Sequence, residues 1–440
     1  MDINLLSQNL IILLSVSAAS ATTFILVNTN KKWLGKWLGK KSIILLSASI
    51  IATAIIELVI HHFFPSDKLP DLMWLMILPF PLSVSLVVLS WHSKISWLKW
   101  LAISNSIICL LITLVLINAY YGFFPTLSSI FNANSRDLTN GTQTTILQFA
   151  SVNRDKTNTI ESNLYSQDST TNGKIEKLKI PGSVSNFSPR DEWAYIPAIA
   201  SSSSNVNLPV LILLPGFPGA TGNWLGSTAL RQTMDEFAKQ HHGIAPIVFM
   251  VDNTGSLTND TECVDSPRGN VETYLTKDVP SYIKIHYKVA TSPSNWAIGG
   301  LSMGGMCSAM IALRHPDVYH YFLDFGGENG PEVGSYSKTV ADIFGGSQKN
   351  WQSHQILQLL KKHKYRDMGA FFAVGQGDSK DLINGIKQAY ADSQKAGIES
   401  FYEKVAGEHT FKVWQQSFKI ALPWLSNRLG ATDCVNSCGL

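Results

Sequence analysis

The stretch W-A-I-G-G-L-S-M-G-G-M-C-S-A-M at 296–310 decides the fold of the C-terminal part of this chain. Residues 300–304 match the pattern G-x-S-x-G, in which two glycines let a strand turn sharply into a helix. A strand-like apolar run precedes the match and a helix-like run follows it, which is the context that the motif needs. The pattern predicts that Ser302 is an exposed nucleophile.

A serine hydroxyl is a poor nucleophile until a base takes its proton, so a histidine is expected later in the chain. His409 follows an apolar stretch and stands just before the last predicted helix, where a loop can bring it over Ser302. The other histidines near or after the motif precede the last predicted strand or lie in helical patterns, which favour surface positions: His286, His315, His320, His354 and His363. We therefore predict that His409 is the base.

The histidine needs an acid that fixes its tautomer and stabilises its charged form. The loop G-Q-G-D after the apolar run F-F-A-V supplies Asp378. Asp381 follows closely and is the alternative, while capping of the next helix is a structural role open to either carboxylate. Asp378 is the predicted third member.

The oxyanion that develops during acyl transfer needs two backbone N–H groups. Met303, the residue after the nucleophile, is expected to supply one, and the loop P-G-F-P-G at 215–219 the other. Pro215 and Pro218 have no N–H. Phe217 is therefore the predicted second donor, with Gly216 as the alternative.

From about residue 173, short apolar runs alternate with helical patterns, which is typical of a parallel sheet covered by helices on both faces. Strands are predicted at 192–197, 209–214, 245–251, 296–300, 319–325 and 369–374. Helices are predicted at 226–240, 271–287, 303–314, 352–363, 380–396 and 411–427. The predicted fold class is α/β, of the α/β-hydrolase type, over residues 173–440.

The N-terminal part, residues 1–124, is far more apolar. Four segments are long enough to cross a bilayer as helices, at about 9–27, 42–62, 71–91 and 100–121. The first lacks the Lys or Arg that opens a signal peptide, and three similar segments follow it, so we interpret it as a true span. The segment W-L-G-K-W-L-G-K at 33–40 suits the headgroup region.

The lysines of the loops predict the orientation of these spans. Lysines cluster between the first and second segments and between the third and fourth, which places both loops in the cytoplasm: Lys31, Lys32, Lys36, Lys40, Lys41, Lys94 and Lys99. Everything after the fourth segment is then extracytoplasmic. Residues 125–172 are rich in Asn, Ser and Thr and are predicted to be a polar linker.

Composition sets limits on function. The chain has 440 residues, 45% of them hydrophobic and only 15% charged, and its formal net charge of +3 does not indicate nucleic-acid binding. Four cysteines lie in the part of the chain predicted to be extracytoplasmic, where disulfides are permitted. Cys263 with Cys307 and Cys434 with Cys438 are the favoured pairs, with free buried thiols as the alternative. No zinc-like spacing is present, so no metal is expected.

The predicted catalytic domain resembles the esterase D family, which includes secreted mycolyltransferases. The likeness is carried by F-S-P-R-D-E-W-A-Y-I-P before L-P-V-L-I-L-L-P-G, by T-Y-L-T-K-D-V-P-S-Y-I at 273–283, by G-L-S-M-G-G-M-C-S-A-M at 300–310, by H-P-D-V-Y-H-Y-F at 315–322 and by H-T-F-K-V-W at 409–414. The resemblance implies ester hydrolysis or acyl transfer through an acyl-serine, with no metal or cofactor. It also implies the triad Ser302, Asp378 and His409 and the oxyanion hole Phe217 and Met303.

Two departures from the mycolyltransferases make trehalose doubtful as an acceptor. Pro215 replaces an acidic residue that contacts the sugar, and Phe411 replaces a Trp after the catalytic histidine. The segment T-N-D-T-E-C-V-D-S-P-R-G at 258–269 lies on the substrate side of the predicted sheet. Glu262, Asp265 and Arg268 are therefore substrate-binding candidates, and a structural loop pinned by Cys263 is the equal alternative.

The favoured function is an extracytoplasmic esterase acting on an ester or lipid substrate at the membrane. An acyltransferase with a sugar or lipid acceptor would use the same catalytic residues. A membrane sensor or adhesin with an unused hydrolase fold is the alternative of another class, and an intact triad argues against it. A transport function is weaker, since Glu57 is the one acidic residue in the interior of the predicted spans, with His61 and His62 at the outer end of the second span.

Overall fold

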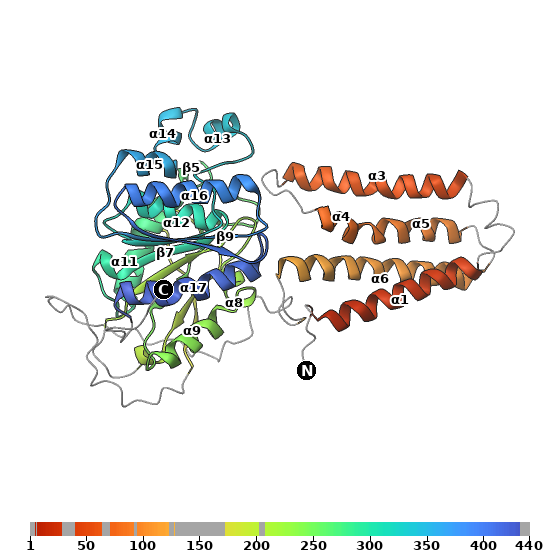
Figure 1. The fold of residues 1–440 in the computed structure, drawn as a ribbon, viewed down its shortest axis with the longest axis horizontal. Coiled ribbons are helices and arrows are strands. Elements are labelled where there is room, and N and C mark those ends of the chain that lie inside the picture. Colours follow the sequence, from red (N-terminus) through yellow and green to blue (C-terminus); the bar gives the residue numbers. More distant parts are fainter. Residues whose placement is uncertain are drawn as a thin grey trace. The chain divides into compact units, whose positions relative to one another are not determined.

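The computed structural model describes residues 7–28, 40–63, 71–91, 95–122, 172–201 and 207–431, together with Leu5 and Leu127. The chain divides into two compact units, residues 1–131 and 132–440, which are described separately (Figure 1). Most of the predicted linker, and Cys434 and Cys438, lie outside the described residues.

The N-terminal unit consists of helices at the four predicted positions. They are α1 (Gln8–Asn28), α3 (Lys40–Phe63), α4 (Asp71–Ile77) with α5 (Pro79–Trp91), and α6 (Ser96–Tyr121). The third predicted segment is thus two helices rather than one. Pro79 has no N–H and disfavours a helical residue before it, which accounts for the break at Leu78.

Among the described residues, only α6 is long and apolar enough to cross a membrane, with a mean hydropathy of 2.4. Shorter apolar stretches cover residues 9–25, 47–58 and 73–88. Four membrane-spanning helices therefore stay a prediction.

The surface of this helical unit is apolar, and its interior holds polar as well as apolar residues. Large apolar side chains such as Leu58, Leu75 and Trp100 are 65–70% exposed, whereas Asn105 is 1% exposed. Asn105 donates to Thr22 Oγ1 at 3.1 Å, linking α6 to α1. Further hydroxyl pairs link α3 to α5 and α5 to α6: Ser49 with Ser85 and Ser83 with Ser106. Small polar residues commonly join helices in this way inside lipid.

The C-terminal unit contains one eight-stranded sheet in the order β1-β2-β4-β3-β7-β8-β9-β10. Its strands are β1 (Lys174–Leu178), β2 (Glu192–Ile196), β3 (Val210–Leu214), β4 (Ile247–Met250), β7 (Trp296–Leu301), β8 (Tyr321–Phe325), β9 (Gly369–Gly375) and β10 (Glu399–Val405). Neighbours from β4 to β10 are parallel, while β1 with β2 and β2 with β4 are antiparallel. A two-stranded ribbon, β5 (Asp265–Ser266) and β6 (Gly269–Asn270), lies outside this sheet.

Helices cover both faces of the sheet. Figure 1 shows α12 (Met303–Arg314), α15 (Ile356–Lys362) and α16 (Lys380–Lys395) over one face, and α8 (Gly222–Gly226), α9 (Leu230–Gln240) and α17 (Phe411–Leu429) over the other. The other α-helices described in this unit are α10 (Val271–Thr273), α11 (Val279–His286), α13 (Tyr336–Asp342) and α14 (Gln348–Gln352). Short 3-10 helices, η2 (Ala198–Ser201) and η4 (Pro293–Asn295), and a π-helical turn, η3 (Tyr274–Asp278), complete the described helices. Strands β3, β7 and β9 are buried along their whole length, as parallel strands covered on both faces must be.

The turn from β7 into α12 depends on two glycines, because neighbouring backbone atoms leave no space for a side chain at either position. A Cβ on Gly300 would lie 2.1 Å from the carbonyl oxygen of Gly304. A Cβ on Gly304 would lie 2.5 Å from the carbonyl oxygens of both Leu214 and Pro215. The first turn of α12 therefore packs directly against the end of β3.

A disulfide joins the loop before β5 to α12. Cys263 and Cys307 are bonded at an S–S distance of 2.08 Å and are 44 residues apart in the chain. Closing a loop of this length contributes about 4 kcal/mol in the chain-entropy model.

A buried carboxyl group ties β2 to two neighbouring segments. Glu192 accepts from the backbone N–H of Asp252 at 3.1 Å and from the Tyr274 hydroxyl at 2.8 Å. Its other oxygen accepts from the N–H of Ile180 at 3.1 Å. Burial raises the pKa of Glu192 to about 8, although these hydrogen bonds oppose the shift. Glu192 is therefore largely protonated at neutral pH.

We expect the stability of the folded chain to fall as the pH rises from about 4.5 to 8, because the folded state holds a proton on Glu192 that the unfolded state has released. The slope from this group is at most about 1.4 kcal/mol per pH unit. Glu192→Gln cannot ionise and should flatten the slope, as measured by thermal unfolding of both proteins at several pH values. An identical slope in the variant would contradict the prediction.

Gly304→Ala should destabilise the C-terminal unit by about 1–3 kcal/mol, because the new methyl group would overlap two backbone oxygens that cannot move independently. Gly226→Ala is the matched control, since a Cβ there meets no atom within 4 Å. Thermal unfolding should show a loss for the first variant and none for the second. Equal midpoints for the two variants would refute this account of the turn.

Candidate active site

The predicted triad and the predicted oxyanion loop follow four parallel strands at their carboxyl ends, and Gly326 follows a fifth. Pro215 follows β3, Ser302 follows β7 and Gly326 follows β8, while Asp378 and His409 come after β9 and β10. Because β3, β7, β8, β9 and β10 are consecutive and parallel, their carboxyl ends share one edge of the sheet. This edge is where parallel α/β sheets bind ligands.

Ser302 lies in a strained backbone conformation between β7 and α12. Its φ of 53° and ψ of −127° are unusual for a residue with a Cβ. The backbone is held there by a hydrogen bond from the Ser302 N–H to the carbonyl oxygen of Phe325 at 2.9 Å. A strained turn between a strand and a helix is the position that the nucleophile of this motif occupies.

His409 lies within hydrogen-bonding distance of Ser302. The distance between His409 Nε2 and Ser302 Oγ is 2.9 Å, although the residues are 107 positions apart. The imidazole packs edge-on against the Trp414 ring, with a centroid distance of 4.9 Å. A Cβ on Gly326 would lie 3.3 Å from His409 Cε1, so a side chain at this position would crowd the imidazole ring.

The structure places Asp378 beside the other imidazole nitrogen. Asp378 Oδ1 lies 3.6 Å from His409 Nδ1, which is within ion-pair range but longer than a hydrogen bond, and the aspartate side chain is 2% exposed. Its second oxygen accepts from the N–H of Gly375 at 2.8 Å. Asp381 is exposed in the first turn of α16, whose cap is Ser379. The geometry therefore favours Asp378 over Asp381.

The loop after β3 reaches the nucleophile. A Cβ on Gly216 would lie 3.0 Å from Ser302 Cβ, so the two backbones are close. Met303 is the first residue of α12, where backbone N–H groups have no acceptor within the helix. Phe217 and Met303 thus belong to the two segments that face the Ser302 side chain, and their role as oxyanion donors stays a prediction.

Asp324 lies beneath this site and was not among the predicted residues. It is fully buried in β8 and accepts from the N–H of Gly327 at 2.7 Å. Burial raises the pKa of Asp324 to about 7, against the effect of that hydrogen bond. The carboxyl group holds the turn after β8, which carries Gly326.

Two of the substrate-binding candidates are buried. Phe411 is 4% exposed and packs edge-on against Trp414, so it supports the ring that contacts His409. Glu262 is 5% exposed and accepts from the N–H of Glu332 at 3.2 Å. Burial, with Asp260 nearby, raises the pKa of Glu262 well above its usual range. These contacts give both side chains structural partners.

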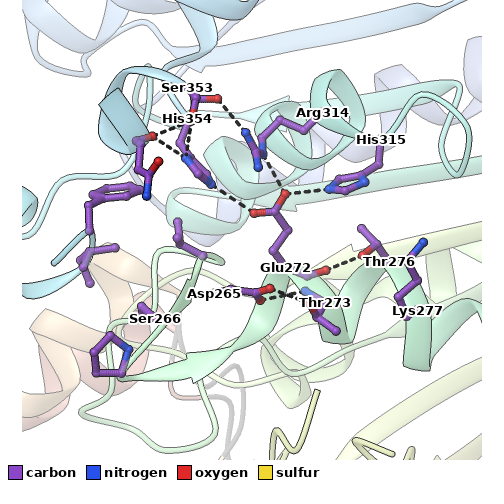
Figure 2. Close-up of a pocket in the computed structure, with 15 residues that line it drawn as sticks. Asp265, Ser266, Glu272, Thr273, Thr276, Lys277, Arg314, His315, Ser353 and His354 are labelled. Atoms are coloured by element: carbon purple, nitrogen blue, oxygen red, sulfur yellow. Dashed lines mark hydrogen bonds and ion pairs between the residues drawn. The ribbon is translucent and has the colours of Figure 1, made fainter. Parts of the chain in front are cut away.

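Asp265 and Arg268 have partners of their own. Asp265 accepts from the backbone N–H and the hydroxyl of Thr273, and Arg268 donates to the carbonyl oxygen of Asp260 at 2.7 Å. Asp265 lines a cavity of about 480 Å³ together with Arg314 and His315 from the end of α12 (Figure 2). Ser302 precedes the start of that helix, about 18 Å away along its axis. This placement does not support a role for Asp265 at the nucleophile.

A buried carboxylate, that of Glu272, lies at the wall of this cavity. Glu272 accepts from Arg314 Nε and lies beside His315 Nε2, both at 2.7 Å, with His354 Nε2 at 3.2 Å from its other oxygen (Figure 2). Burial acts to raise its pKa, but the three hydrogen bonds outweigh burial and hold the pKa of Glu272 well below its usual range. The cluster joins α10 to the end of α12 and to the segment before α15. Among the described residues, no group of His, Cys, Asp and Glu has the arrangement of a metal site.

Known proteins resemble the chain in sequence and in fold. A family model described as "Putative esterase" matches residues 194–425. An uncharacterized protein of Corynebacterium glutamicum is 33% identical over 335 residues, which are 74% of this chain and 75% of that protein. The match is longer than the C-terminal domain and so extends into the residues before it.

Solved structures also resemble the C-terminal unit, at low sequence identity. A ferulic acid esterase has a TM-score of 0.50 and 18% identity, covering 58% of this chain and 98% of its own. An S-formylglutathione hydrolase from Agrobacterium tumefaciens has a TM-score of 0.49 and 18% identity, covering 60% and 98%. The sheet order and the likeness to the ferulic acid esterase identify an α/β-hydrolase-like fold. Since the family model spans more than half of the chain, the protein belongs to this esterase family and is an enzyme of the esterase class.

Proposed function

We propose that the chain is a membrane-anchored serine esterase that hydrolyses acyl esters through an acyl-serine intermediate, on the outer side of the membrane. The observation that carries the proposal is the 2.9 Å distance between Ser302 Oγ and His409 Nε2. A serine hydroxyl next to a basic nitrogen, with a buried carboxylate behind the ring, has the arrangement needed for nucleophilic catalysis.

In the first half of the reaction, Ser302 Oγ attacks the ester carbonyl carbon while His409 Nε2 takes the hydroxyl proton. The carbonyl oxygen becomes an oxyanion, which the N–H groups of Phe217 and Met303 stabilise. The tetrahedral intermediate then expels the alcohol, which receives the proton from His409. The acyl group remains as an ester of Ser302.

In the second half, His409 takes a proton from water, and the resulting hydroxide attacks the acyl carbon. Collapse of the second intermediate releases the carboxylic acid and returns the proton to Ser302. Asp378 orients the imidazole and stabilises its charged form throughout. Acyl transfer, the alternative from the sequence, would differ only in that an alcohol replaces this water.

The N-terminal unit supports membrane anchoring. Its large apolar side chains are exposed, while Asn105 and several serines lie between the helices. Extended apolar surfaces of this kind on a helical bundle are typical of proteins embedded in lipid. The lysines of the two predicted inner loops and the disulfide of the C-terminal unit both favour an outward-facing catalytic domain.

Ser302→Ala should lower the turnover of a short-chain aryl ester by at least about 10⁴-fold, because no other group can form the acyl intermediate. Ser337→Ala, at an exposed position in α13, is the matched control and should retain full activity. Steady-state hydrolysis of p-nitrophenyl acetate measures both. Appreciable turnover by the Ser302 variant would rule out the mechanism.

A membrane-impermeant fluorophosphonate should label intact cells that carry the wild-type chain and should not label cells that carry Ser302→Ala. The reagent needs both an activated serine and access from outside, so labelling tests topology and chemistry together. Labelling that appears only after lysis would reverse the proposed orientation. Absence of labelling in either condition would favour a non-catalytic role.

A further inference from the structure

We propose that Arg190 and Asn253 are positioning residues that hold the 215–219 loop in the conformation needed to stabilise the oxyanion. The inference rests on the proposed function, since it concerns the same reaction. Neither residue belongs to the predicted triad or to the oxyanion hole. Both act through backbone carbonyl oxygens at opposite ends of the loop.

Arg190 fixes the far end of the loop. Its Nη2 atom donates to the carbonyl oxygen of Gly219 at 2.9 Å and to Asp252 Oδ1 at 2.7 Å. The side chain is 21% exposed, whereas that of Asp252 is fully buried. One guanidinium group thus bridges the segment after β4 and the loop after β3.

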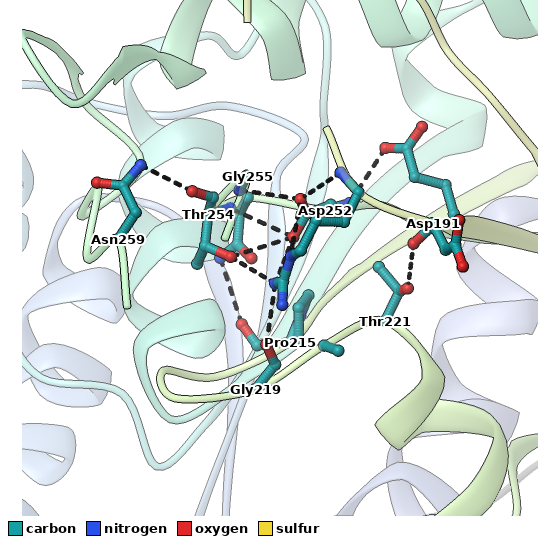
Figure 3. Close-up of polar contacts among 12 residues, drawn as sticks. Asp191, Pro215, Gly219, Thr221, Asp252, Thr254, Gly255 and Asn259 are labelled. Carbon is teal, nitrogen blue, oxygen red and sulfur yellow. Dashed lines mark hydrogen bonds and ion pairs between the residues drawn. The ribbon is translucent and has the colours of Figure 1, made fainter. Parts of the chain in front are cut away.

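Asp252 holds the guanidinium group in place. It accepts from Arg190 Nε as well as from Nη2, and from the Arg190 backbone N–H at 2.8 Å. It also accepts from the N–H of Gly255 at 2.9 Å. Figure 3 shows Asp252, Thr254 and Gly255 grouped together, with Gly219 and Pro215 lying next to them. Because Asp252 neutralises the charge of Arg190, the contribution of Arg190 at the loop is mainly geometric.

Asn253 fixes the near end of the loop. Its Nδ2 atom donates to the carbonyl oxygen of Pro215 at 3.3 Å, and the side chain is fully buried. The preceding carbonyl oxygen, that of Leu214, accepts from Trp224 Nε1 at 3.1 Å. Side chains from two different segments therefore set the peptide planes where the chain leaves β3.

The predicted donor, the N–H of Phe217, lies between these two fixed ends. The loop turns tightly, because a Cβ on Gly219 would lie 2.5 Å from the carbonyl oxygen of Gly216. An oxyanion hole is effective only when its donors are already oriented before charge develops. If either end of the loop is released, the Phe217 N–H can rotate away without any change in Ser302 or His409.

The test compares Arg190→Lys and Asn253→Ala with the wild type, in the full-length chain solubilised in detergent. Lysine keeps the positive charge beside Asp252 but lacks the planar fork that contacts Asp252 and Gly219 together. Arg428→Lys is the matched control for the first variant, because Arg428 pairs with Glu399 at the surface. Asn295→Ala controls the second, since its amide also donates to a backbone carbonyl oxygen, that of Leu429 at 2.9 Å, but lies before the amino end of β7.

Three quantities are measured for each protein, with the concentration of active sites set by fluorophosphonate titration. They are kcat and KM for p-nitrophenyl acetate, the inhibition constant of an aryl trifluoromethyl ketone, and the thermal midpoint. The ketone forms a tetrahedral oxyanion on Ser302, so it reports on the oxyanion hole. The corresponding methyl ketone, which forms little adduct, reports on binding of the neutral group.

We expect each variant to lose about 10-fold or more in kcat with KM changed less than about 2-fold, because a transition-state contact is weakened. The inhibition constant of the trifluoromethyl ketone should rise by the same factor as kcat falls, and that of the methyl ketone should not. The control variants should match the wild type.

The outcomes separate this inference from the function on which it rests. A wild type that neither hydrolyses the ester nor binds the trifluoromethyl ketone would overturn both. An active wild type with unchanged variants would overturn the positioning role alone. Normal activity per titrated site together with a lower thermal midpoint would also overturn the positioning role, because the two residues would then be structural.

Discussion

The site depends on a close approach between two pieces of backbone, the first turn of α12 and the end of β3. Gly304 lies against the carbonyl oxygens of Leu214 and Pro215, and Gly216 lies against Ser302. A side chain at either glycine would separate the helix from the loop. Because both predicted oxyanion donors lie on these two segments, the same contact that packs the core sets the distance between them.

The parts of the site that follow local patterns could be predicted from the sequence. Ser302 lies within a motif whose glycines, strand and helix are all contiguous, and His409 stands in the segment before the last helix. Strands β1 and β10 were missed, because they are the edge strands of the sheet and carry charged residues instead of apolar runs. The break at Leu78 was not predicted, because the continuous apolar run over residues 71–91 indicated a single helix despite Pro79 and Pro81.

Contacts between segments that are distant in the sequence leave no local pattern from which they could be predicted. Arg190 and Asp252 are 62 residues apart, and their pairing depends on the sheet order that brings β2 next to β4. Asp324 looks like an ordinary strand residue until its complete burial is known. Asp265 and Glu262 illustrate the opposite case, since nearness to a predicted substrate edge suggested binding, whereas in the structure they bond to neighbouring segments.

The disulfide between Cys263 and Cys307 makes the structure around the site depend on oxidation after synthesis. It attaches the loop that follows Asn253 to the helix that begins after the nucleophile, so this link near Ser302 exists only when two thiols have been oxidised. A newly made chain in a reducing cytosol would lack that constraint. If the catalytic domain lies outside the membrane, as proposed, oxidation of this pair would be a maturation step that follows export.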